Sequence, residues 1–186
     1  VDAAIALFVD HGDRARPLAG GTDLLVQLRQ GRDDVDLVVD VKRIPELTQV
    51  AYDPELGLTM GAAVTCMMLS ESEQVRNLYP GLIDAVAIIG GVAIRGRATL
   101  GGNLCNAAPS ADSIPAMMVL GAEVEIAGPG GRRWVSVADF CTGPGQTVLV
   151  PGEFVTSFHF PPPRPDAGAC YVRFTPRGEM YIAVAG

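Results

Sequence analysis

Two pairs of adjacent glycines in this chain have neighbours that could bind phosphate oxygens. The first pair belongs to the run Leu18-Ala19-Gly20-Gly21-Thr22-Asp23-Leu24. Because glycine adopts backbone conformations that a side chain would forbid, successive N–H groups in such a turn can point at one anion. The Thr22 hydroxyl can donate to the same oxygen, and Asp23 can cap a helix whose N-terminus adds partial positive charge. The alternative is an ordinary tight turn in front of a helix.

The second pair lies in the run Thr99-Leu100-Gly101-Gly102-Asn103, where Thr99 and Asn103 add short polar side chains on either side. Asp112 follows, and a carboxylate is a natural acceptor for ribose hydroxyls. Asp112 could also cap a helix that begins near Ser113. Because a diphosphate bridges two anion sites better than one, the two glycine runs together predict a dinucleotide pyrophosphate held mainly by backbone donors.

Other chemistry has little support in the sequence. The chain contains neither G-x-x-x-x-G-K-[ST] nor a G-x-G-x-x-G turn in the first run. Its four cysteines include no C-x-x-C pair, so we expect reduced, buried thiols and no zinc or iron–sulfur cluster. His11 and His159 have no Ser or Cys close by in the sequence and are expected at the surface or in the core. We therefore predict no catalytic residue and no metal ligand in this chain.

Composition narrows the class of protein further. A net charge of −7 argues against nucleic acid, whose phosphates require clustered Lys and Arg. A hydrophobic content of 48% excludes a disordered chain, yet no apolar run reaches the ~18 residues of a membrane span. We expect a globular, cytoplasmic protein with no nucleic-acid partner and no membrane span.

The hydrophobic pattern divides the chain into two units. Residues 1–52 read as helix, glycine turn, short helix and buried strand, which is an α/β unit. Residues 53–186 predict an antiparallel sheet with helices on one face, an α+β arrangement. The strands expected there are 56–61, 122–127, 132–137, 148–150 and 153–160, with helices after Thr65, at 80–89 and at 113–120. One glycine run falls in each unit, so a ligand between the units would touch both.

The two glycine runs also carry a family resemblance. LAGGTDLLVQLRQG at 18–31, followed by RGRATLGGNLCNAAPSADSIPAMMVLGAEVEI at 95–126, closely resembles the FAD-binding medium subunit of the molybdenum hydroxylases. That family includes xanthine dehydrogenase, carbon monoxide dehydrogenase and 4-hydroxybenzoyl-CoA reductase. The resemblance implies a two-subdomain α+β FAD-binding fold of the vanillyl-alcohol-oxidase (PCMH) type. Both ends of the chain fall inside expected elements, so we expect a fragment lacking the start of the FAD domain and the family's C-terminal domain.

The same resemblance implies residue roles and partners. Residues 18–24 and 99–103 would hold the FAD pyrophosphate, and Asp112 would bond the ribose or ribityl hydroxyls. Ile89 would lie near the adenine and Ile182 near the isoalloxazine ring. Molybdenum–pterin and [2Fe–2S] clusters are expected in a large and a small partner subunit, in a dimer of heterotrimers. Electrons from those clusters would leave through FAD to an external acceptor.

Departures from the family pattern leave some points open. Residues 93–99 read AIRGRAT where the family often has Q-I-R-N-x-A-T, so local contacts there can differ. The absence of a cysteine-rich insertion argues against a close relation to 4-hydroxybenzoyl-CoA reductase. Val184 stands where NAD-using xanthine dehydrogenases often have lysine, so the electron acceptor stays open. Position 22 holds threonine and not a histidine that could bond covalently to the flavin, so covalent attachment is not expected. Two alternatives remain: a self-sufficient flavin oxidase or reductase, and a relative that keeps the fold without FAD.

Overall fold

The first part of the chain forms a small α/β unit. The computed structural model describes residues 1–31 and 34–173, so Ile182 and Val184 lie outside the described residues. β1 and β2 pair in parallel, as the α/β reading of this region implies. The elements of this unit are α1 (Asp2–His11), η1 (Gly12–Arg14), β1 (Ala15–Leu18), α2 (Leu24–Arg29), β2 (Leu37–Asp40), η2 (Val41–Arg43) and η3 (Pro45–Thr48).

A small hydrophobic core joins this unit to the rest of the molecule. Ala4 and Phe8 are spaced four residues apart, on the buried face of α1. The Phe8 ring meets the edge of Phe154 at a centroid distance of 5.3 Å. Phe154 begins β9 (Phe154–Phe160), a strand of the large sheet, and Ala127 of the same sheet is buried in the same cluster. The buried side chains of the first unit therefore form one cluster with residues of the large sheet.

The large sheet has five antiparallel strands in the order β3-β4-β9-β5-β6. The central strand β9 (Phe154–Phe160) is almost wholly buried, because the first unit covers part of one face and helices cover the other. The pairing of β5 with β9 shifts at a bulge between Glu125 and Ile126. The other strands are β3 (Val50–Asp53), β4 (Gly57–Gly61), β5 (Glu123–Gly128) and β6 (Gly131–Ser136).

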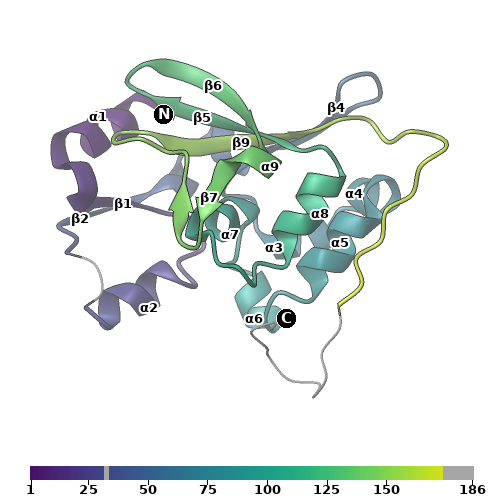
Figure 1. The fold of residues 1–186 in the computed structure, drawn as a ribbon, viewed down its shortest axis with the longest axis horizontal. Helices are drawn as coiled ribbons and strands as arrows, with labels where there is room; N and C mark the ends of the chain where they lie inside the picture. The colour runs from purple at the N-terminus through teal and green to yellow at the C-terminus, as the bar shows by residue number, and fades with distance from the viewer. Residues whose placement is uncertain (32–33, 174–186) are drawn as a thin grey trace.

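Seven short helices and a small hairpin complete the described part of the second unit. Figure 1 shows the sheet along one side, the helices beneath it and the α1–β2 unit at one end. Buried side chains such as Leu82, Leu100, Met117 and Phe158 form the main core between sheet and helices. The remaining elements are α3 (Cys66–Glu71), α4 (Glu73–Leu78), α5 (Pro80–Ala87), α6 (Val92–Arg95), α7 (Leu100–Asn106), α8 (Ser113–Val119), α9 (Val137–Phe140), β7 (Cys141–Gly143) and β8 (Gln146–Thr147).

The predicted α+β class is confirmed, with differences in detail. Residues 148–150 were expected to be a strand, but β8 ends at Thr147, and Val148 and Leu149 instead pack against the main core. The predicted boundary at residue 52 falls within β3, all four residues of which pair with β4. Within the described residues, no helix is both long and apolar enough to cross a membrane.

The cysteines are free thiols in different environments. Cys66 is buried, and burial raises its pKa to about 11. Burial likewise raises the pKa of Cys105 to about 12, with the neighbouring Cys141 adding to the effect. Cys105 and Cys141 are half-buried and Cys170 is exposed, so the expectation of four buried thiols is confirmed for Cys66 and wrong for the other three. Among the described residues, no group of three or more His, Cys, Asp or Glu side chains could hold a metal ion.

Candidate functional site

The first glycine run connects the end of β1 to the start of α2. Gly21 has φ +74°, a left-handed conformation that favours glycine. The backbone N–H groups of Gly20 to Leu24 donate no hydrogen bond to any described residue. This stretch is half-buried to exposed, so these donors are accessible to a ligand or to water. Successive donors without protein acceptors, leading into a helix N-terminus, are compatible with an anion-binding turn.

A lysine that sequence reasoning missed fixes the back of this turn. The Lys42 Nζ donates to the carbonyl oxygens of Ala19, at 2.8 Å, and Leu18, at 3.3 Å. It also lies 2.7 Å from an Asp40 carboxylate oxygen, and its hydrogen bond lowers the Asp40 pKa. Because Lys42 occupies the carbonyls, the N–H groups of the turn are left for another partner. The sequence feature that could have identified Lys42 is its position shortly after β2, the strand that pairs with β1.

The structure shows contacts of both polar side chains of the first run, and the predicted donation from Thr22 to a phosphate oxygen stays a prediction. The Thr22 hydroxyl lies 3.5 Å from the Asp23 carboxylate, to which it donates. Asp23 makes no side-chain cap to α2, so that prediction is wrong. The reason is backbone geometry: Asp23 already has helical φ and ψ of −101° and −50°, whereas a capping side chain needs an extended backbone.

The second glycine run is the first turn of α7 and not a loop. Thr99 caps the helix, because its buried hydroxyl accepts from the Gly102 N–H at 2.9 Å. Neither Gly101 nor Gly102 has positive φ, so neither is needed for unusual backbone geometry. A side chain on Gly101 would place its Cβ 2.5 Å from the Ala62 carbonyl oxygen. Gly101 is therefore required for packing, whereas Gly102 faces solvent.

The structure places the first glycine run and the helix that follows it against residues that flank the second run. A Cβ on Gly20 would lie 2.2 Å from the carbonyl oxygen of Arg97, just before the second run. A hydrogen bond from Gln27 Nε2 to Asn106 Oδ1, at 3.2 Å, links α2 to α7. That a ligand between the units would touch both runs stays a prediction.

Asn103 and Asp112 lie on the same side of the second unit, connected through α8. The Asn103 Oδ1 accepts from the buried hydroxyl of Ser113, so this side chain is partly used within the protein. Asp112 makes no cap to α8, and that alternative is wrong. Its carboxylate accepts from the Tyr171 hydroxyl at 3.1 Å, and Arg173 lies 3.9 Å away.

Burial, and then the Asp112 charge, raises the pKa of Tyr171, which therefore remains a hydrogen-bond donor at neutral pH. Sequence reasoning missed Tyr171 because a contact between residues so far apart leaves no local pattern.

Two further features lie close to these residues. Ile89 is half-buried against the main core, and its predicted adenine contact stays a prediction. A mostly apolar cavity of about 380 Å³ lies beyond the end of α7, lined by Ala107, Pro109, Ile114 and Pro144 among others. None of the predicted site residues lines it, so the predicted phosphate contacts lie outside this cavity.

Comparisons with known proteins agree with this geometry. The family described as the FAD binding domain in molybdopterin dehydrogenase matches residues 1–163, and the chain belongs to that family. The putative xanthine dehydrogenase FAD-binding subunit of Escherichia coli K12 is 38% identical over 184 residues, 98% of this chain and 63% of that subunit. The carbon monoxide dehydrogenase medium chain of Afipia carboxidovorans is 32% identical over 182 residues, which are 98% of this chain and 63% of that one.

Solved structures show the same fold. The Cu,Mo-CO dehydrogenase superposes with a TM-score of 0.83 at 32% identity, over 87% of this chain and 56% of that one. Quinoline 2-oxidoreductase from Pseudomonas putida 86 superposes with a TM-score of 0.83 at 32% sequence identity, over 88% of this chain and 56% of that chain. The chain thus spans less than two thirds of these relatives. The family and the FAD-binding fold predicted from the glycine runs are confirmed.

Proposed function

We propose that the two glycine runs hold the pyrophosphate of FAD, with the first run as the main donor. The observation that carries this proposal is the row of accessible N–H groups from Gly20 to Leu24, which have no acceptor among the described residues. Lys42 behind the turn adds a positive charge near the phosphates. In a chain with net charge −7, aligned backbone dipoles and this one ammonium are the means by which two phosphate charges are stabilised.

Asp112 is proposed to hold the ribose or ribityl hydroxyls. Its carboxylate offers about four acceptor positions, of which the Tyr171 hydroxyl occupies one. The side chain retains 20% exposure, so a hydroxyl can approach it. The residues present therefore fit a flavin dinucleotide.

The whole protein is proposed to act as a flavin relay in a molybdenum hydroxylase. Bound FAD supplies the redox chemistry, and this chain supplies binding, orientation and electrostatics. The partners would be a molybdopterin-binding large subunit and a [2Fe–2S] small subunit, in a cytoplasmic dimer of heterotrimers. Support comes from the family and from relatives named as subunits of xanthine and carbon monoxide dehydrogenases. The two subdomains are proposed at 1–52 and 53–186.

A titration with flavins of different length tests the proposed contacts. Apo-protein is titrated with FAD, FMN and riboflavin, following flavin fluorescence, and FAD should bind far more tightly than the other two. Asp112→Asn should weaken FAD binding, whereas the exposed Asp139→Asn serves as the matched control. Equal affinity for all three flavins would contradict the pyrophosphate assignment.

The relay itself is tested in the assembled complex. Removing FAD should stop electron delivery to an artificial acceptor that draws on the flavin, while substrate still reduces the iron–sulfur clusters. Restoring FAD should recover the lost activity. Substrate turnover by this subunit alone would favour a self-sufficient flavin enzyme instead.

A further inference from the structure

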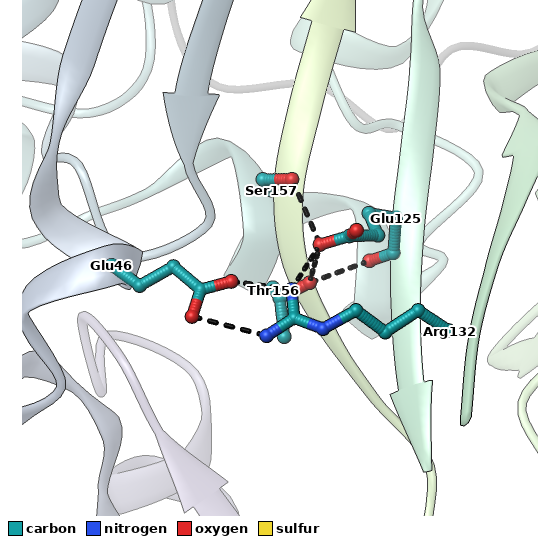
Figure 2. Close-up of polar contacts among 5 residues, drawn as sticks. All are labelled: Glu46, Glu125, Arg132, Thr156 and Ser157. Carbon is teal, nitrogen blue, oxygen red and sulfur yellow. Dashed lines mark hydrogen bonds and ion pairs between the residues drawn. The ribbon is translucent and has the colours of Figure 1, made fainter. Parts of the chain in front are cut away.

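Arg132 on β6 forms an ionic bridge between the first unit and the sheet. Figure 2 shows its guanidinium between Glu46, which comes from η3, and Glu125 on β5. The contact with Glu46 is two-pronged: Nη1 meets Oε1, and Nη2 lies 3.1 Å from Oε2. Nη1 also lies 2.7 Å from Glu125 Oε2. A bidentate arginine–carboxylate pair within a network fixes geometry better than an isolated surface pair does.

The sheet side of this bridge is itself held rigidly at the β-bulge. The Glu125 side chain is only 12% exposed, and its Oε2 accepts from Thr156 Oγ1 at 2.6 Å and Ser157 Oγ at 3.3 Å. Both hydroxyls come from β9, opposite the point where the register shifts. The guanidinium thus contacts a carboxylate that is already positioned by the central strand.

Both ends of the bridge lead to the glycine runs. On the side of the first unit, Glu46 follows closely after Lys42, whose ammonium holds the first run. On the sheet side, the Thr156 carbonyl accepts from the Ala62 N–H at 2.9 Å, and Ala62 is the residue against which Gly101 packs. The bridge therefore connects the segment that carries Lys42 to the strand that supports the packing of the second run.

We propose that Arg132 is a positioning residue for FAD, which keeps the first glycine run in the correct place relative to the second by clamping Glu46 to Glu125. The inference rests on the proposed flavin site. Without the clamp, the first unit samples orientations in which the two runs no longer fit one diphosphate. Because only the fitting fraction binds, the apparent dissociation constant for FAD rises as that fraction falls.

The neighbouring Arg133 provides a matched control. It makes a comparable bidentate pair with Glu153, at 2.9 and 2.7 Å, and both arginine side chains are about two-fifths exposed. The Arg133 pair stays inside the second unit, however, and joins β6 to the turn before β9. Arg132→Gln and Arg133→Gln should therefore lose similar amounts of stability while differing in their effect on the flavin.

The experiment measures the FAD dissociation constant and the apo-protein melting temperature of the full chain. Arg132→Gln and Glu46→Gln should each raise the dissociation constant about fivefold, the effect of one partly exposed network pair, and Arg133→Gln less than twofold. The double variant of Arg132 and Glu46 should be no worse than either single variant, because each removes the same clamp.

The experiment distinguishes a failure of the positioning role of Arg132 from a failure of the proposed flavin site. Equal FAD affinities for the Arg132 and Arg133 variants, or fully additive effects of Arg132 and Glu46, would overturn the positioning role while leaving the flavin site intact. A wild-type chain that does not prefer FAD over FMN would overturn the proposed function and this inference together.

Discussion

The two glycines of the second run should respond differently to the same substitution: Gly101→Ala should destabilise the fold, and Gly102→Ala should chiefly weaken FAD binding. In Gly101→Ala the new Cβ would lie 2.5 Å from the Ala62 carbonyl oxygen and 2.9 Å from its Cβ. Relief requires β4 and α7 to separate, and overpacking of this kind costs roughly 1–3 kcal/mol. For a domain of this size, that corresponds to a melting temperature lower by about 2–12 °C.

Gly102→Ala should leave the apo-protein nearly as stable as the wild type. Its Cβ would meet only Thr99 Oγ1, at 3.2 Å, which has to yield by a few tenths of an ångström. Alanine gains about 1 kcal/mol over glycine inside a helix, and this offsets the tight contact. We expect a net change within about 1 kcal/mol of zero.

Flavin binding separates the two variants from a general loss of stability. If the pyrophosphate lies against the exposed face of this helical turn, a methyl group on Gly102 stands between the phosphate and the backbone. FAD affinity should then fall at least tenfold in Gly102→Ala, although the fold is intact by circular dichroism. Calorimetric melting of the apo-protein and fluorescence titration with FAD together give both quantities. A Gly102→Ala variant that retains wild-type affinity would refute the proposed contact at this position.

Three further predictions concern charge and thiol chemistry. Lys42→Met should weaken FAD binding several-fold in a fluorescence titration, because the turn loses the ammonium that holds its carbonyls; unchanged affinity would remove Lys42 from the site. Hydrogen bonds from arginines are the chief cause that lowers the pKa of the Glu46 and Glu153 carboxyls below the ordinary value of 4.5. Both carboxylates therefore stabilise the fold at pH values above 4.5. This stabilisation should be lost as the pH falls through the lowered pKa values of the folded state, and the urea concentration at the midpoint of unfolding should fall with it. Cys170 is exposed, whereas the thiol of Cys66 is buried and has its pKa raised to about 11 by that burial, so one equivalent of maleimide at neutral pH should label Cys170 first by peptide mapping; equal labelling would contradict the burial of Cys66.

Local patterns in the sequence predicted most elements, and tertiary contacts decided the rest. The α/β unit and the strands around Gly57 and Phe154 follow from hydrophobic periodicity. The helix at Gly101 and Gly102 could not be predicted, because glycine has low helix propensity and its presence here is explained by close packing on Ala62.

The sequence predicted the glycine runs and Asp112 of the candidate site, but not Lys42 or Tyr171. Asp112 is a plausible cap by local rules, but a phenol from the far end of the described chain uses its carboxylate instead. Lys42 was missed for a related reason: lysine is common on surfaces, and its value here depends on where the neighbouring strand ends. Contacts of this kind are fixed by three-dimensional arrangement and leave no spacing to detect.

The shared strand β9 has a consequence for how the protein is made. Phe8, near the start of the chain, completes its core only when Phe154 arrives, near the end of the described residues. During synthesis on the ribosome, the first glycine run is therefore exposed long before the surface that supports it exists. We expect the nascent N-terminal segment to remain protease-sensitive until β9 emerges, and then to become protected together with the sheet in a single late step.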